Sequence, residues 1–144
     1  MAVITPKLTI SANSNSATTN PGPASIAISL TATPTDNTST VSTVETQIYT
    51  TTTDPVKVLD SANYGVDTYV YMKNLETVVH ADQEIYIGIT EGTQNDMETE
   101  SGTDDRTMRL QAGEFCFFPW SGDQDIYVEG SSASDELEIW VFKQ

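Results

Sequence analysis

Apolar and polar residues alternate along much of this chain, and a period of two is typical of β-strands that bury one face. The cleanest example is Glu84–Thr90, in which Ile85, Ile87 and Ile89 share one face. Similar alternation or short apolar runs occur at Val3–Ala12, Ser25–Thr31, Val41–Thr53, Val56–Leu59, Val66–Leu75, Thr107–Leu110, Glu114–Phe118, Asp125–Glu129 and Glu136–Phe142. Turn-forming residues separate these segments, and no stretch has a convincing helical period. The pattern predicts an all-β fold, an antiparallel β-sandwich or jelly roll with an extended N-terminal arm.

The two ends of the chain differ in character. Residues 1–53 are rich in Thr, Ser and Asn, whereas charges and aromatic residues become frequent from Asp54 onward. Pro6 makes Val3–Ala12 an edge strand or an extended arm, because proline removes a donor from a strand ladder. The polar segment Ser11–Pro23 is typical of a connector. We therefore divide the chain into an N-terminal arm with Thr-rich hairpin strands (1–53) and a compact β-sandwich (54–144).

The most apolar segment, Met108–Trp120, predicts a strand, an Ala-Gly turn and a second strand that is apolar on both faces. In this second strand Phe115 and Phe117 share one face, and Cys116 and Phe118 share the other. Strands of this kind are buried on both sides. We expect the opposite sheet to cover one face and a neighbour or a partner subunit to cover the other.

Further aromatic residues extend this apolar region. Pro119 is expected to end the strand by removing a donor, and Trp120 to open a loop. Trp140 and Phe142 lie on the outward side of the last strand. This is more aromatic surface than one small sandwich can hide, so we predict a homo-oligomer, with a trimer favoured. The candidate contact residues for other copies or partners are Leu8, Ile10, Phe115, Phe117, Phe118, Trp120, Trp140 and Phe142.

The net charge of the chain limits the classes of partner that it is expected to bind. The formal net charge is −15 and the sequence pI is about 4.1. Nucleic acid is therefore not expected as a direct partner, since phosphate binding needs clustered Lys and Arg. No run approaches the ~18 apolar residues of a membrane span, and the N-terminus lacks the basic start of a signal peptide. We expect no membrane association and synthesis in the cytoplasm.

Candidate catalytic chemistry is sparse. His80 is the single histidine, and no Gly-x-Ser-x-Gly motif accompanies it, so a loop position beside Asp82 is the preferred reading. Cys116 is the single cysteine, which rules out an internal disulfide and favours a buried, inert thiol over a nucleophile. One histidine and one buried cysteine also argue against a zinc site. We predict no enzymatic activity and no cofactor.

Calcium is the strongest ligand hypothesis. The segment Glu91–Arg106 is a long acidic loop, and Asp123 and Asp125 form an Asp-x-Asp turn farther along. Calcium takes 6–8 oxygen ligands from flexible carboxylate loops, but the spacing here does not match an EF-hand. We favour a loop that is simply solvated. The candidate ligands are Asp96, Glu98, Glu100, Asp104 and Asp105.

Three segments carry a resemblance to known proteins. Thr68–Glu76 (TYVYMKNLE), Leu110–Phe115 (LQAGEF) and Leu137–Phe142 (LEIWVF) together look like parts of the small β-sandwich virion proteins of tailed bacteriophages. The resemblance covers roughly residues 64–144 and implies a capsid decoration (cement) protein, or another minor head or neck component. It implies the major capsid protein or other virion proteins as partners, and the capsid surface as the location. The Ser/Thr/Asn-rich first third fits the extended arms of such proteins.

Two readings of the remaining surface stay open. Leu8 and Ile10 suit Val3–Ala12 for strand addition to a partner's sheet edge, so deleting residues 1–23 is expected to leave a folded sandwich that no longer binds. A carbohydrate-binding sandwich of a phage appendage is the alternative function, because outward aromatic residues can stack on sugars or pack between subunits. These outward aromatic residues are Tyr69, Tyr71, Tyr86, Tyr127 and Trp140.

Overall fold

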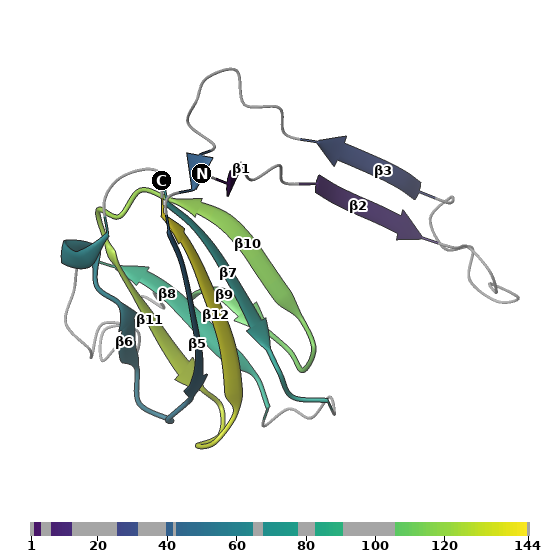
Figure 1. The fold of residues 1–144 in the computed structure, drawn as a ribbon. Helices are drawn as coiled ribbons and strands as arrows, with labels where there is room; N and C mark the ends of the chain where they lie inside the picture. Colours follow the sequence, from purple (N-terminus) through teal and green to yellow (C-terminus); the bar gives the residue numbers. More distant parts are fainter. Residues whose placement is uncertain are drawn as a thin grey trace, which may run out of the picture. The chain divides into compact units, whose positions relative to one another are not determined.

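The computed structural model describes residues 2–3, 7–12, 26–31, 40–41, 43–64, 68–77, 83–90 and 106–143 (Figure 1). The chain divides into two compact units, Met1–Val41 and Ser42–Gln144. The boundary lies earlier than the one expected after residue 53. The reason is that Thr43–Thr50 (β5) pairs along its whole length with Glu136–Lys143 (β12), so the Thr-rich strand belongs to the second unit.

The second unit is a sandwich of two four-stranded antiparallel sheets, which confirms the all-β sandwich expectation. The order of strands is β10-β7-β12-β5 in the first sheet and β6-β11-β8-β9 in the second, and Figure 1 shows the two sheets facing each other. The remaining strands are β6 (Val56–Leu59), β7 (Thr68–Asn74), β8 (Ile85–Thr90), β9 (Arg106–Leu110), β10 (Phe115–Trp120) and β11 (Asp125–Gly130), and Ser61–Asn63 forms a short 3-10 helix, η2.

The core fills the space between the two sheets. Val70, Met72 and Ile139 of the first sheet face Ile87 and Ile126 of the second, and each of these side chains is fully buried. Each such residue is separated from its core neighbour on the same strand by one outward residue, as the period of two requires. Full burial of a side chain of this size contributes about 1.5–3 kcal/mol relative to exposure, so this layer is what holds the sheets together.

One buried polar side chain also joins the sheets. Asn74, at the end of β7, is fully buried. Its Nδ2 donates to the carbonyl oxygens of Gln83 at 2.9 Å and Leu110 at 3.1 Å, which belong to the second sheet and its approach. Its Oδ1 accepts from the backbone N–H of Glu76 at 3.0 Å. All the hydrogen-bonding groups of this amide side chain are therefore engaged, as a buried polar side chain requires.

Strand β10 occupies an edge of the first sheet, where β7 is its single neighbour among the described strands (Figure 1). Cys116 and Phe118 point inward and pack against the core. Phe115 and Phe117 point outward and are 61% and 38% exposed. Burial on both faces is therefore not achieved within the described part of the chain, and a covering partner subunit stays a prediction.

Two expectations about neighbouring elements need correction. Pro119 does not end β10, which continues to Trp120 opposite Thr68. An edge strand tolerates proline because it needs a donor on one side alone. The strand that is buried on both faces is β11, in which every residue from Ile126 to Gly130 is buried.

The first unit contains two short antiparallel pairs. Ala2–Val3 (β1) pairs with Thr40–Val41 (β4), and Lys7–Ala12 (β2) pairs with Ile26–Thr31 (β3) over six residues each. The segment expected to be an unpaired arm or an edge strand is thus, over β2, one strand of a two-stranded ribbon. The extended arm itself stays a prediction.

Candidate functional site: the aromatic face of the first sheet

The outward side of the first sheet collects most of the exposed apolar side chains of the described residues. Residues that lie opposite each other in an antiparallel ladder share a face, so the strand register alone brings these residues together. We call this surface the aromatic face. It includes Val44, Ile48, Tyr69, Tyr71, Lys73, Phe115, Phe117, Glu138, Trp140 and Phe142.

The register orders the aromatic face into rows that cross the sheet. In the central row Phe117 of β10 lies opposite Tyr71 of β7, and Tyr71 lies opposite Trp140 of β12. An adjacent row contains Lys73 and Glu138 in the same two inner strands. Residues separated by more than sixty positions in the sequence thus become neighbours.

The apolar exposure is concentrated here. Five large hydrophobic side chains of the described residues are exposed, and all five lie on this face: Val44 (46%), Ile48 (65%), Phe115 (61%), Phe117 (38%) and Trp140 (38%). Single exposed apolar residues are ordinary, but a contiguous patch marks a surface for interaction.

The rings of the aromatic face hold one another in place. Tyr69 and Phe117 stack with centroids 5.5 Å apart and planes 3° apart. Tyr71 meets Trp140 edge-on, at 6.5 Å and 84°, and Phe117 meets Phe142 at 6.3 Å and 65°. These are favoured aromatic geometries. Because such contacts already restrict the rotamers of the rings, binding a partner here would cost less side-chain entropy.

Between these rings lies an open hollow of about 330 Å³, lined by Tyr71, Phe117, Glu138, Trp140 and Phe142. We call it the aromatic hollow. Its one charged group is the carboxylate of Glu138. Burial, followed by the nearby charge of Glu138, raises the pKa of Tyr71, so this phenol stays neutral and can act as a hydrogen-bond donor. The hollow therefore offers aromatic surface, one hydroxyl and one negative charge.

The outward aromatic residues of the second sheet behave differently. Tyr127 is 5% exposed, so the expectation of an exposed ring is wrong for this residue. Tyr86 lies beneath the guanidinium of Arg106, which is 4.3 Å from the ring centroid, and Arg106 also pairs with Glu129 at 2.8 Å. The aromatic surface available for binding is therefore confined to the first sheet.

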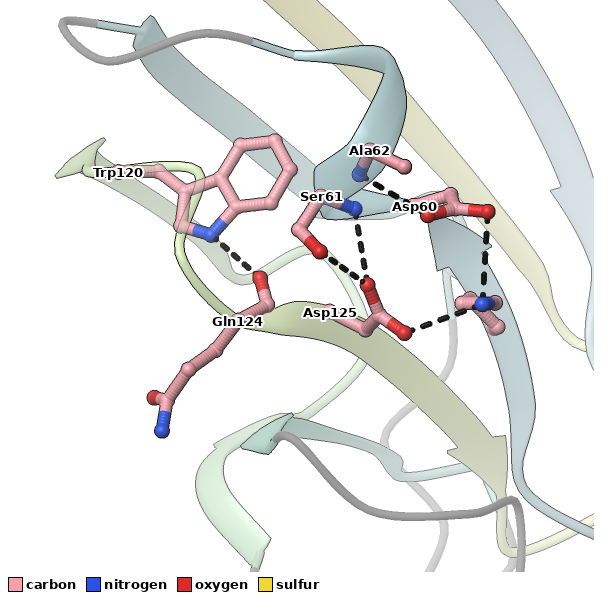
Figure 2. Close-up of polar contacts among 7 residues, drawn as sticks. Asp60, Ser61, Ala62, Trp120, Gln124 and Asp125 are labelled. Carbon is pink, nitrogen blue, oxygen red and sulfur yellow. Dashed lines mark hydrogen bonds and ion pairs between the residues drawn. The ribbon is translucent and has the colours of Figure 1, made fainter.

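Two of the expected contact residues point inward. Phe118 packs against the core, because it has the opposite orientation to Phe117 along β10. Trp120 is 4% exposed, and its Nε1–H donates to the carbonyl oxygen of Gln124 at 2.9 Å (Figure 2). These two residues stabilise the sandwich. The ring of Trp120 also packs against Tyr64, at 5.3 Å between centroids.

The second aspartate of the Asp-x-Asp turn, Asp125, is part of a structural corner. In Figure 2, Asp125 accepts from the backbone N–H of Ser61 (2.8 Å) and from its hydroxyl (2.7 Å). The Nζ of Lys57 donates to the other oxygen of Asp125 at 3.0 Å. Burial raises the pKa of Asp125, but the Ser61 and Lys57 donors outweigh it and hold the pKa below its usual range. Asp60 caps η2 by accepting from the N–H of Ala62 at 3.0 Å. Protein donors occupy both oxygens of Asp125.

The cysteine has the properties of a structural residue. Cys116 is half-buried against the core, and burial raises the pKa of its thiol to about 11. A thiol is a nucleophile only as the thiolate, and the thiolate is scarce at neutral pH when the pKa is this high.

Other expected site residues lie outside the described ranges. His80 and the candidate calcium ligands Asp96, Glu98, Glu100, Asp104 and Asp105 all belong to this group. Among the residues that are described, no three His, Cys, Asp or Glu side chains gather as a metal site would require. Within the same ranges, no helix has the length and apolar character to cross a membrane.

Comparisons with protein-family models, with curated proteins and with solved structures find no match to this chain. The sequence pattern located Phe115, Phe117, Trp140 and Phe142 on this surface, and it marked Tyr69 and Tyr71 as outward. The alternation along Glu136–Phe142 also places Glu138 on the side of Trp140 and Phe142, but the sequence did not indicate that Val44 and Ile48 belong to the same face. Outward apolar residues on the Thr-rich strand were the available signal for Val44 and Ile48.

Proposed function

We propose that this chain is a non-enzymatic structural protein of a tailed-phage virion, of the capsid decoration (cement) type. In this proposal it binds the major capsid protein or other virion proteins at the outer head shell. The observation that carries the proposal is the aromatic face, on which all five exposed large hydrophobic side chains of the described residues gather. A surface of this kind is suited to a protein partner. The resemblance over residues 64–144 is the reason why we propose a virion protein as this partner.

The first unit offers a second surface, which we assign to assembly of copies. In the β2–β3 ribbon, the register places Leu8 opposite Leu30 and Ile10 opposite Ile28. A two-stranded ribbon is marginally stable by itself and needs cover for an apolar face. We propose that ribbons of several copies provide this cover in a homo-oligomer, with a trimer favoured.

Size measurement by light scattering tests the assembly. The full chain is expected to form an oligomer, and a chain that lacks residues 1–23 is expected to be a monomer with an intact sandwich, because the deletion removes β2. A full-length monomer, both free and on the particle, would contradict the assembly proposal. A deleted chain that still forms the oligomer would place the contact on the sandwich.

Binding to empty head shells of the parent virion tests attachment. A double variant with Ile48→Ser and Phe115→Ser removes the two most exposed apolar side chains without touching the core. It is expected to co-sediment with shells at least ten-fold more weakly than the natural protein, since it loses the apolar area of two large side chains that the partner would bury. Asn63→Ser, at an exposed position of η2, is the matched control and is expected to bind normally. Equal binding by all three proteins would refute attachment through this face.

Carbohydrate binding by a phage appendage is the second candidate function. The aromatic hollow favours it, because Tyr71 and Trp140 offer ring surfaces beside the Glu138 carboxylate, which can accept sugar hydroxyls. Titration with a glycan panel, followed through the indole signal of Trp140, tests it. A saturable shift with one glycan class and no binding to shells would favour this function over the first.

A further inference from the structure

We propose that the aromatic hollow binds an arginine side chain that a basic surface of the partner protein presents. The inference rests on the proposed function, and it specifies the chemistry of the partner at this site. Four rings and one carboxylate line the hollow. A guanidinium can stack on aromatic rings and pair with a carboxylate at the same time, which few other protein groups do.

The chain already fills two comparable arrangements with its own cations. Arg106 lies 4.3 Å from the ring centroid of Tyr86 and pairs with Glu129 at 2.8 Å. At a separate place, a lysine takes the same role. Lys143 lies 4.2 Å from the ring centroid of Tyr64 and pairs with Glu45 at 2.7 Å. Each arrangement consists of an aromatic ring, a carboxylate and a cation between them.

The aromatic hollow has the first two components and lacks the third. Tyr71 and Trp140 supply rings, and Glu138 supplies the carboxylate. Lys73 is the Cα partner of Glu138, but the two side chains form no ion pair within the described part of the chain. Glu138 is the carboxylate that lines the hollow, and none of the ion pairs among the described residues involves it.

The shape of the hollow suits a flat cation. Tyr71 and Trp140 meet at 84°, and Phe117 and Phe142 meet at 65°, so rings border the hollow from more than one direction. A volume of about 330 Å³ exceeds that of a guanidinium group, which leaves room for the apolar stem of arginine beside the rings. The stem would cover apolar surface while the charged group meets the carboxylate.

The overall charge favours the same kind of partner. The chain carries −15, and the charges of Lys7 and Asp36 in the first unit cancel, so the sandwich unit holds the whole excess. A strongly acidic body attracts a basic surface at long range and repels a second copy of itself. We therefore assign the hollow to a basic partner rather than to a face-to-face dimer of sandwiches.

An NMR titration with a short peptide tests the inference. The probe is acetyl-Gly-Arg-Gly-amide, and the control is the same peptide with citrulline, which keeps the shape of arginine without its charge. The arginine peptide is expected to shift the indole signal of Trp140 in a saturable way, with the citrulline peptide at least five-fold weaker. The assignment uses Trp140→Phe, which leaves the buried Trp120 as the remaining indole.

Variation of the carboxylate completes the test. Glu138→Gln keeps size and is expected to weaken arginine binding by roughly two- to five-fold, as for an exposed ion pair, and to reduce its salt dependence. Glu136→Gln, an exposed neighbour on the same strand that does not line the hollow, is the matched control and is expected to change little. Equal affinity for both peptides, or no saturable shift, would overturn the inference.

The shell-binding assay separates the two proposals. The natural protein and Glu138→Gln could bind shells with equal affinity and equal salt dependence. In that case the partner uses the aromatic face without placing an arginine in the hollow. If the peptide binds as expected and shells do not bind, the inference about the hollow stands and the decoration function fails.

Discussion

The amide of Asn74 is predicted to be one of the largest single polar contributions to the stability of the sandwich. It is fully buried and makes three side-chain hydrogen bonds, to Gln83, Leu110 and Glu76. Asn74→Leu removes all three and leaves two carbonyl groups and one N–H group facing an apolar side chain. A net loss of about 1 kcal/mol for each bond gives about 3 kcal/mol, or roughly a 150-fold change in the folding equilibrium constant.

Urea denaturation followed by tryptophan fluorescence measures this loss. Both tryptophans belong to the second unit, and the buried Trp120 reports on its unfolding. With a slope of about 2 kcal/mol per molar urea, the midpoint of Asn74→Leu is expected about 1.5 M lower than that of the natural protein. Asn63→Leu, at an exposed position, is the control and is expected within about 0.5 kcal/mol of the natural protein.

A second substitution at this position separates polar chemistry from packing. Asn74→Asp keeps the shape but places a carboxyl group against the two carbonyl oxygens that now accept from Nδ2. Burial against two carbonyl oxygens, with the N–H of Glu76 as the remaining donor, raises the folded-state pKa of this carboxyl above its unfolded value, so the folded variant binds more protons than the unfolded chain. The stability of the variant, relative to the natural protein, is therefore expected to fall as pH rises from about 4 to 7. If Asn74→Leu stays within 0.5 kcal/mol of the natural protein, the amide is not the link between the sheets that we infer.

Three further predictions concern other described contacts. Asp125→Ala is expected to cost about 2 kcal/mol through loss of the Ser61 hydrogen bonds, and Asp125→Asn to remove part of the acid sensitivity. Because the pKa of Asp125 is lowered from 3.8, the stabilisation by its carboxylate is present above about pH 4 and is lost as pH falls through the folded-state pKa. Chemical denaturation between pH 2 and pH 6 checks this. Parallel curves of unfolding free energy against pH for the natural protein and Asp125→Asn would contradict it. Gly130→Ala is expected to lower the melting temperature and cost about 1–3 kcal/mol, because a Cβ would overlap the side chain of Thr51; an unchanged melting temperature would refute the close approach. Cys116 is expected to react with iodoacetamide at pH 8 about 100-fold more slowly in the folded protein than in the unfolded chain, since its pKa rises from 9.0 to about 11; equal rates would show an accessible thiol.

The sequence by itself determined the type and the approximate position of the strands in the second unit. Segments such as Glu84–Thr90 and Glu136–Phe142 alternate apolar and polar residues with a period of two. Each forms a strand in the structure, with the expected residues pointing inward. The inert character of Cys116 also followed from its apolar surroundings in the sequence. These properties depend on neighbours within a few positions, so the local pattern contains them.

The tertiary structure alone decided which strands lie at edges and which are covered on both sides. By its apolar character Phe115–Phe118 suggested the doubly buried strand, but β10 is an edge strand and β11, which contains Asp125 and Glu129, is the one buried on both faces. Strand order is set by pairing between distant segments, and the composition of one strand does not encode its neighbours. For the same reason the boundary between the two units lies before β5 and not after residue 53, because β5 pairs with β12 at the far end of the chain.

The aromatic face is the clearest case of this division. The sequence marks Phe117, Tyr71 and Trp140 as outward residues on three separate strands, and it contains nothing that makes them neighbours. The ladders β10-β7 and β7-β12 place them in one row, with Glu138 in the next. A one-residue shift in either ladder would turn an aromatic residue into the core and a core residue outward. The burial of Val70, Met72 and Ile139 therefore fixes the register, and the register creates the hollow that we propose as the binding site.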